Sequence, residues 1–241
     1  LLISFIPIIG LFFYLYIISI NWFMKGTKGA NKYGPEYEDY LKSKIPNIDF
    51  VRTSDCRLKL QWNKVGFMDF PIDDPIVVID IDILLMNDYM ELIEYPIERG
   101  QFLGLNAWWK DTANPRYTLN GAFYKYYPKD CKYIYKKLMN DPQYWMNRYI
   151  AAGITHGPVN GEQYFVEDSV KEELELIYVP SSWFGKMILN PGSKWLNDCN
   201  DAYPGEYFYS REENKFNSDV KLVHFQKTRS LHELWKTTQQ E

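Results

Sequence analysis

The sequence predicts one α/β domain with a mixed, mainly parallel central sheet flanked by helices. Segments with the composition of strands alternate with segments of helical spacing over the first 80 residues, which is the order of βαβ units. Residues 76–79 form the uninterrupted apolar run IVVI, and parallel sheets bury such runs on both faces. No linker-like change of composition divides the 241 residues, so a single domain is expected.

The expected elements of the first half rest on apolar runs and on Gly and Pro as breakers. They are a strand within Tyr16 to Phe23, a Gly-rich loop, a helix from Pro35 to about Lys44, a strand from Ile48 to Thr53, a helical segment over 60–70 and a strand from Ile76 to Ile79. Asp73, Asp74 and Pro75 separate the last two of these.

The second half is less regular. Its expected elements are strands over 100–108, 118–126, 174–180 and 220–225, a helix from Asp130 to Asn140 and a short helix over 162–170. Residues 190–217 have the composition of a loop, and that length without structure is typical of a functional loop or a flap.

Composition excludes several classes of protein. The net charge of -4 argues against general nucleic-acid binding, which needs a basic surface. The three cysteines lie far apart and form no CxxC, so neither a disulfide framework nor a zinc site is expected. No Asn-x-Ser/Thr glycosylation acceptor occurs. The sequence is compatible with either a cytoplasmic or a membrane-associated protein.

The first twenty residues carry no charge, which is long enough to cross a bilayer. If a strand begins at Tyr16, however, only residues 1–15 remain as a leader. These fifteen residues are interpreted either as a membrane anchor or signal core, or as an extra buried or unstructured leader, with the domain proper over 16–241.

Two carboxylates follow the apolar run 76–79. Residues i and i+2 of a strand face the same side, so Asp80 and Asp82 project together if the strand continues through them. Ligands bind at the carboxyl ends of parallel strands. Unpaired buried carboxylates are costly, and a divalent cation such as Mg²⁺ or Mn²⁺ removes that cost while it binds substrate phosphates. The other interpretation is that Asp80 makes a local cap and Asp82 faces solvent.

A second polar site ends the segment VKLVHFQK, residues 220–227. His224 follows an apolar strand-like run, and an imidazole can complete the ligand shell of Mn²⁺. Lys227 can balance phosphate charge.

Five stretches together resemble a GT-A fold (Rossmann-like) glycosyltransferase of the DxD type, similar to small single-domain enzymes of bacteria and large DNA viruses. They are KGTKGANKYGPEY after the first strand, Trp62-Asn63-Lys64, VVIDIDILLMND, LNGAFYKY with GEQYF forty residues later, and VKLVHFQK. Their order and spacing carry the resemblance over residues 16–228.

The resemblance implies a role for each matching residue. Asp82 would hold the metal directly, Asp80 would reach the ribose or share the metal, and His224 would be the third protein ligand. The residues implied around the nucleotide are Asn21, Lys28, Thr53 and Asp55 at the base, and Lys64 and Lys227 at the ribose or phosphates. Those implied beside the donor sugar and the acceptor are Asn120, Gly121, Glu162 and Gln163.

The sequence departs from the family pattern at three places. The family often has Asp where this chain has Glu162, whose side chain is one methylene longer. The first Gly-rich loop holds the extra residues 29–31. After His224 the family often has Gly, where this chain has Gln226 and Lys227.

The implied activity is metal-dependent transfer of a sugar from a nucleoside-diphosphate sugar to a glycan or another hydroxyl acceptor. Glu162 is the candidate general base; the alternatives are that it binds donor hydroxyls or caps the helix that follows. Trp108 and Trp109 are either a stacking platform for the acceptor or ordinary packing.

Three other classes of protein remain as alternatives. VVIDIDILL also resembles the nucleophile motif of haloacid-dehalogenase-like phosphatases, but about eighty residues precede it, and Leu84 stands where that family has Thr or Val. A nucleotidyltransferase acting on sugar phosphates would share the metal carboxylates, and GTKGANK partly matches its Gly-rich loop. The last alternative is a non-catalytic carbohydrate-binding domain.

Overall fold

The structure of the protein is a computed structural model. The structure describes residues 35–45, 58, 60–80, 83–107, 117–155, 161–188 and 218–226, together with four short strand segments at 16–18, 49–50, 209–210 and 215–216.

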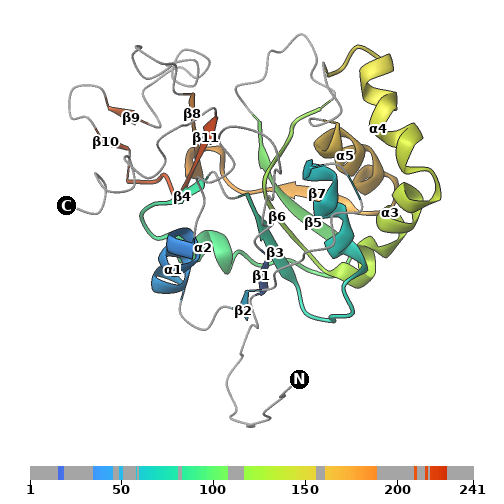
Figure 1. Cartoon of the computed structure of the whole chain (residues 1–241). Coiled ribbons are helices and arrows are strands. Elements are labelled where there is room, and N and C mark those ends of the chain that lie inside the picture. Colours follow the sequence, from blue (N-terminus) through green and yellow to red (C-terminus); the bar gives the residue numbers. More distant parts are fainter. Residues whose placement is uncertain are drawn as a thin grey trace.

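The central sheet has six strands (Figure 1). In spatial order they are β2 (Asp49–Phe50), β1 (Tyr16–Ile18), β3 (Ile76–Ile79), β6 (Leu119–Tyr126), β5 (Gln101–Asn106) and β7 (Glu175–Tyr178). β1 pairs in parallel with β2 and β3, and β5 pairs in parallel with β7. β6 is antiparallel to both of its neighbours, β3 and β5, so it alone runs against the other five. The predicted mixed and mainly parallel sheet is confirmed.

A second sheet of three strands lies beside the first (Figure 1). It has the order β4 (Ile83–Leu85), β11 (Leu222–Gln226) and β8 (Phe184–Ile188), with β11 antiparallel to β4 and parallel to β8. A short hairpin of β9 (Tyr209–Ser210) and β10 (Lys215–Phe216) falls within the stretch 190–217 that the sequence assigned to a loop.

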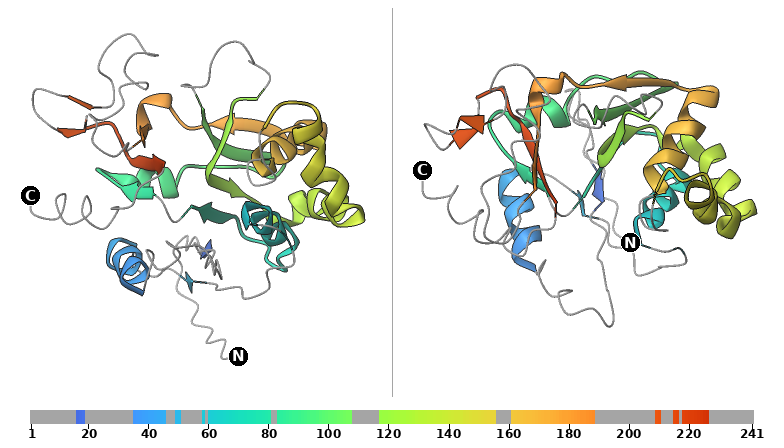
Figure 2. Two further views of the ribbon diagram at one scale, coloured as in Figure 1. Left: turned by 45° about the horizontal axis from the view of Figure 1, so that its top comes forward. Right: turned by 90° about the horizontal axis from the view of Figure 1, so that it is seen from above.

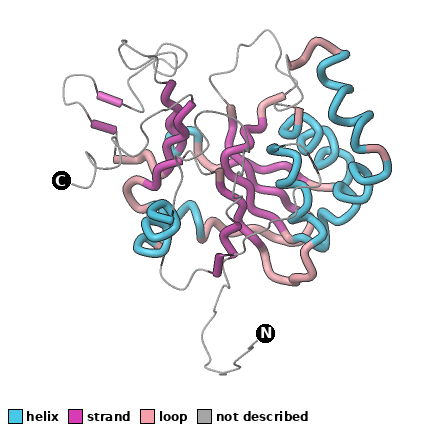
Figure 3. The backbone as a smooth tube through the Cα atoms, in the orientation of Figure 1, coloured by secondary structure: helices cyan, strands magenta, loops and turns pink. Residues whose placement is uncertain are grey.

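The helices form two groups (Figures 2 and 3). One face of the central sheet carries η2 (Leu60–Asp69), α3 (Pro128–Asn140), α4 (Pro142–Ala151) and α5 (Glu162–Glu173). The second sheet, α1 (Pro35–Lys44) and α2 (Tyr89–Ile93) lie toward the other side. The short 3₁₀ turn η3 (Ser181–Trp183) leads into β8.

Alternating side chains of β3 divide between two apolar cores, as the period of a strand requires. Ile76 and Val78 pack with η2, α3 and α5, whereas Val77 and Ile79 pack with α2 and the second sheet. All four are at most 3% exposed, which explains why this strand reads as a continuous apolar run.

Two local features differ from the sequence predictions. β3 ends at Ile79 and the chain enters β4, in the other sheet, at Ile83, so the condition that one strand continues through Asp80 and Asp82 is not met. The segment 60–69 is a 3₁₀ helix, and Trp62, Val65 and Met68 are buried at its period of three.

The sequence analysis also missed α2 and α4. The expected helix ended at Asn140, and no helix was expected after it. Asp141 is in fact the N-cap of α4, where its side chain accepts a hydrogen bond from the Tyr144 backbone N–H at 2.9 Å, and Pro142 occupies the first turn. Within the described ranges, no helix is long and apolar enough to cross a membrane.

Candidate active site

The carboxyl end of β3 meets the beginning of β6. Because the two strands are antiparallel, with Ile79 opposite Phe123, residues 120–122 lie level with the chain just beyond β3. The Asp80 backbone N–H donates to the Ala122 carbonyl at 2.9 Å and extends this pairing by one bond. Asp80, Asn120 and Gly121 are thereby brought to one edge of the sheet, where ligands of α/β proteins bind.

Lys64 connects this edge to η2. Its side chain is 2% exposed, and its ammonium lies 2.7 Å from Asp80 Oδ1 and donates to the Gly121 carbonyl at 2.7 Å. The same ammonium is 3.9 Å from Glu162 Oε2. A buried cation therefore stands between two carboxylates from distant parts of the chain.

Glu162 is the first residue of α5 and is 2% exposed. It comes this close because Gly161 lets the helix start approach η2: a Cβ at Gly161 would lie 2.9 Å from the Trp62 ring. Its side chain reaches Lys64 and Tyr124 in the interior. These contacts do not support the alternative that Glu162 serves mainly as a helix cap.

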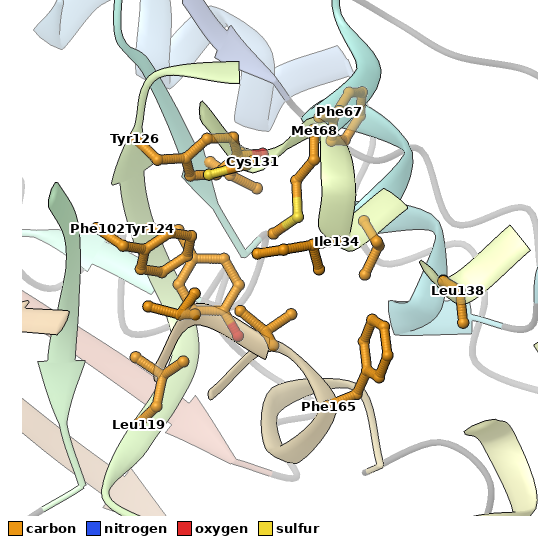
Figure 4. Packing of buried hydrophobic residues seen from close by; sticks show 14 of the residues in the cluster. Phe67, Met68, Phe102, Leu119, Tyr124, Tyr126, Cys131, Ile134, Leu138 and Phe165 are labelled. Atoms are coloured by element: carbon orange, nitrogen blue, oxygen red, sulfur yellow. The ribbon is translucent and has the colours of Figure 1, made fainter. Parts of the chain in front are cut away.

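Tyr124 belongs to this site and was missed from the sequence. Its hydroxyl donates to Glu162 Oε1 at 3.3 Å, and its ring centroid lies 5.6 Å from the Lys64 ammonium. The ring packs against Phe102 in the core beneath the site (Figure 4). A buried tyrosine usually has a partner for its hydroxyl, and the two tyrosines of LNGAFYKY could have been noticed on that ground, although the sequence does not show which of them faces a carboxylate.

Burial dominates the electrostatics of the site. Loss of solvation raises the pKa of Glu162 from 4.5 to about 7. Lys64 and the Tyr124 hydrogen bond lower it, whereas the Asp80 carboxylate raises it, and burial outweighs the two lowering effects. Burial, and then the charge of Glu162, also raises the pKa of Tyr124 well above its ordinary range, so its hydroxyl stays a donor.

Gly121 lies at the centre of these groups. A Cβ on this residue would be 3.2 Å from Lys64 Nζ, 3.2 Å from the Tyr124 hydroxyl and 3.5 Å from Glu162 Oε2. Next to it, Asn120 is 5% exposed and its Oδ1 accepts from the Ala122 backbone N–H at 2.9 Å. Gln163 is half-buried in the first turn of α5.

His224 lies in the second sheet, opposite Ile83. Ile83 directly follows Asp82 in the chain, so strand pairing brings His224 to the segment that carries the two aspartates. A carboxylate such as Asp80 and an imidazole fit Mn²⁺ or a similar ion. Among the residues that the structure describes, however, no group of three or more His, Cys, Asp or Glu side chains is arranged to hold a metal.

Several predicted site residues lie outside the described residues, and their predicted roles stay predictions: Asn21, Lys28, Thr53, Asp55, Asp82 and Lys227. The same holds for Trp108 and Trp109. The described part of the site is therefore Lys64, Asp80, Asn120, Gly121, Tyr124, Glu162, Gln163 and His224.

No protein-family model and no curated protein sequence matches the chain. Solved structures of glycosyltransferases are similar to it in fold. Galactosyltransferase LgtC in complex with donor and acceptor sugar analogs has 8% identity and a TM-score of 0.49, with 93% of this chain and 94% of that one covered. A glycosyltransferase involved in glycosylation of the major capsid of PBCV-1 has 14% identity and a TM-score of 0.48, with 92% and 98% covered.

Two structures of the glycosyltransferase GlyE of Streptococcus pneumoniae are also similar. They have 12% and 10% identity and TM-scores of 0.41 and 0.44, with 61% and 70% of this chain covered. This chain spans only 36% and 46% of their length. At such identities and TM-scores the likeness identifies neither donor nor acceptor. The chain itself has the mixed, mainly parallel α/β sheet that the sequence predicted, in which β6 alone is reversed.

Proposed function

We propose that the protein is a glycosyltransferase that uses a nucleoside-diphosphate sugar and Mn²⁺ or Mg²⁺, and transfers the sugar to a hydroxyl group of a glycan or another acceptor. The convergence of Lys64, Asp80 and Glu162 around the Gly121 backbone carries this proposal. It lies at the edge of the sheet where α/β proteins bind nucleotides. The five sequence stretches that resemble DxD-type transferases add support.

Asp80, Asp82 and His224 are the residues that would hold the metal. The pairing of β11 with β4 supports this choice because it sets His224 opposite the residue after Asp82. When bound, the ion would offset the negative charge that develops on the departing diphosphate. Lys64 holds Asp80 in place from the interior through their 2.7 Å ion pair.

The other assignments follow the resemblance. Asn120, Gly121 and Gln163 lie beside the donor sugar. The nucleotide is bound by Asn21, Lys28, Thr53, Asp55 and Lys227. Glu162 either accepts the proton of the acceptor hydroxyl or hydrogen-bonds the donor sugar. A pKa of about 7 suits a general base at neutral pH, because the ideal base titrates near the working pH.

The first test is ligand-induced thermal stabilisation with and without Mn²⁺, over a panel of nucleoside diphosphates, nucleoside-diphosphate sugars and nucleoside triphosphates. Metal-dependent stabilisation by a diphosphate and its sugar conjugates is expected. Stabilisation selective for triphosphates would favour a nucleotidyltransferase, and stabilisation by free glycans alone would favour a carbohydrate-binding domain. Either result would contradict the proposal.

The second test is the variant Asp82→Ala. We expect it to lose metal-dependent hydrolysis of the donor while the cooperative unfolding transition survives, because the ion would lose a direct carboxylate ligand. Asp74→Ala is the matched control, since Asp74 is an exposed aspartate before the other end of β3. Unchanged hydrolysis in Asp82→Ala, or equal loss in both variants, would refute the site.

A further inference from the structure

We propose that Tyr124 is the positioning residue of the candidate site: its buried hydroxyl fixes the Glu162 carboxylate against Lys64, and so sets the pH range over which Glu162 works. The part of this inference that concerns catalysis rests on the proposed function. The part that concerns the Glu162 carboxyl group itself does not.

The hydroxyl approaches Glu162 from the strand side. Tyr124 donates to Oε1 at 3.3 Å, while the Lys64 ammonium lies 3.9 Å from Oε2. The two oxygens of one carboxylate thus have different partners, from β6 and from η2. Two partners on two oxygens restrict rotation of the carboxylate, which one partner alone would not do.

The close approach depends on missing side-chain atoms at Gly121. The position of a Cβ there would be 3.2 Å from both the Tyr124 hydroxyl and Lys64 Nζ. Since Gly121 also supplies the carbonyl that Lys64 binds, one residue provides the space for the cluster and one of its acceptors.

The Tyr124 ring is itself immobilised. It is 1% exposed and lies 5.2 Å from the centroid of Phe102, which also stacks on Tyr126 at 5.1 Å (Figure 4). Tyr126 is a natural comparison because it is buried in the same strand and against the same ring. In the described part of the chain, the Tyr126 hydroxyl has no hydrogen-bond partner. Packing thus accounts for both rings, whereas only the Tyr124 hydroxyl touches the site.

The charges around Glu162 determine in which direction its pKa changes when the Tyr124 hydroxyl is removed. Lys64 from η2 and the Tyr124 hydroxyl from β6 favour the ionised carboxylate, and Asp80 beyond β3 disfavours it. The charge of Glu167, five residues further along α5, raises the pKa of Tyr124. Removing the Tyr124 hydroxyl takes away a donor to the anion, so Glu162 should hold its proton to a higher pH.

The first measurement is the pH profile of kcat/KM for donor turnover in wild type, Tyr124→Phe and Tyr126→Phe. We expect the acidic limb to move up by about one pH unit in Tyr124→Phe, since a hydrogen bond to a charged group is worth roughly that much. The limb should stay in place in Tyr126→Phe. Superimposable profiles for wild type and Tyr124→Phe, or equal shifts in both variants, would overturn the proposal.

A second measurement needs no turnover. The Glu162 carboxyl ¹³C resonance, assigned by its absence in Glu162→Gln, should titrate at higher pH in Tyr124→Phe than in wild type or Tyr126→Phe. An unchanged titration would overturn the inference even in an active enzyme. If wild type turned over no donor while the titration shifted as expected, the proposed function would fail and the positioning role would stand.

A double-mutant cycle separates positioning from general damage. In a Glu162→Gln background, Tyr124→Phe should cause little further loss of kcat/KM, because the two residues act as one unit. Fully additive losses would mean that Tyr124 acts on something other than Glu162.

Discussion

At the level of single residues, Gly121 is the position with the least tolerance for change. Its backbone carbonyl binds the Lys64 ammonium, and its Cα faces the groups that Lys64 and Glu162 bring together. Any side chain there must displace polar atoms that are themselves buried and bonded. Displacing these atoms would pull paired charges apart, and an unpaired charge in the interior costs free energy.

Gly121→Ala should therefore damage both stability and the site. The new methyl group would lie 3.2 Å from Lys64 Nζ and from the Tyr124 hydroxyl, tighter than ordinary contact. Overpacking of this kind costs about 1–3 kcal/mol, and we expect a loss of at least about tenfold in kcat/KM from the misplaced groups. Urea unfolding and donor turnover measure the two effects.

Gly66→Ala is the matched control for that substitution. Gly66 lies in η2, the helix that also carries Lys64, but a Cβ at Gly66 would meet nothing within 4 Å. Its stability should be unchanged or slightly higher, because alanine restricts the unfolded chain. A Gly121→Ala variant as stable and active as Gly66→Ala would show that the site is looser than these distances imply.

The sequence predicted most of the described site residues but not their mutual contacts. Asp80, Asn120 and Glu162 were selected as motif residues, and they do lie together. Tyr124 was not, because its role depends on which carboxylate faces it across 38 positions of sequence. Lys64 was expected at the ribose or phosphates; its bonds to Asp80 and the Gly121 carbonyl are tertiary contacts that no local pattern contains.

At the level of elements, side chains of α5 accept hydrogen bonds from the beginning of β6. Glu167 is fully buried, and its carboxylate accepts hydrogen bonds from the Thr118 and Leu119 backbone N–H groups at 3.0 and 2.8 Å. The neighbouring Asp168 accepts from the hydroxyls of Tyr117 and Tyr149. One helix thus carries Glu162 at its start and, about one turn later, holds the strand that carries Gly121.

Glu167→Ala should destabilise the protein by about 3 kcal/mol, since it removes a buried carboxylate that accepts from the Thr118 and Leu119 backbone N–H groups and pairs with Lys171. For a domain of this size, that corresponds to a fall of roughly 10 °C in the unfolding midpoint. Glu172→Ala, on the same helix, removes a half-exposed ion pair with Lys137 and should change stability by less than about 1 kcal/mol. Equal midpoints for the two variants would contradict this account of α5.

The elements that the sequence predicted best are those with strong local signals. The strand at 76–79 and the helix opened by Pro35 have the predicted bounds. The break after Ile79 was not predictable in the same way, because residues 83–85 continue the apolar pattern while they join a different sheet. Periodicity records burial, and burial does not reveal which sheet buries a strand.

At the level of the whole molecule, the site lies where two separately packed cores meet the same strand. One core lies between the central sheet and η2, α3 and α5, and the other between that sheet, α2 and the second sheet. The pairing of β11 with β4 joins residues about 140 positions apart. Such long-range pairing is fixed by tertiary packing, so the local sequence pattern marked His224 as a candidate ligand without showing which strand lies opposite it.

The free energy of unfolding of the whole domain should depend on pH because Glu162 is buried. Its pKa of about 7 in the folded chain lies above the ordinary 4.5, so the folded state binds this proton more tightly than the unfolded state. Below about pH 4.5 both states are protonated and no cost arises. Between about pH 4.5 and pH 7 the unfolded state releases this proton while the folded state keeps it, so the free energy of unfolding falls by roughly 3 kcal/mol from this group, and the loss is complete above pH 7.

Glu162→Gln isolates that contribution, because the amide resembles the protonated carboxyl at every pH while all other titrating groups are retained. Urea unfolding of both proteins at pH 5 and pH 8 gives the difference in stability between them at each pH. We expect wild type to lose stability relative to Glu162→Gln between the two values. If wild type instead gained relative stability with rising pH, Lys64 and the Tyr124 hydroxyl would outweigh burial. Glu162 would then be a permanently ionised partner of Lys64 and could not serve as a base that titrates near neutrality.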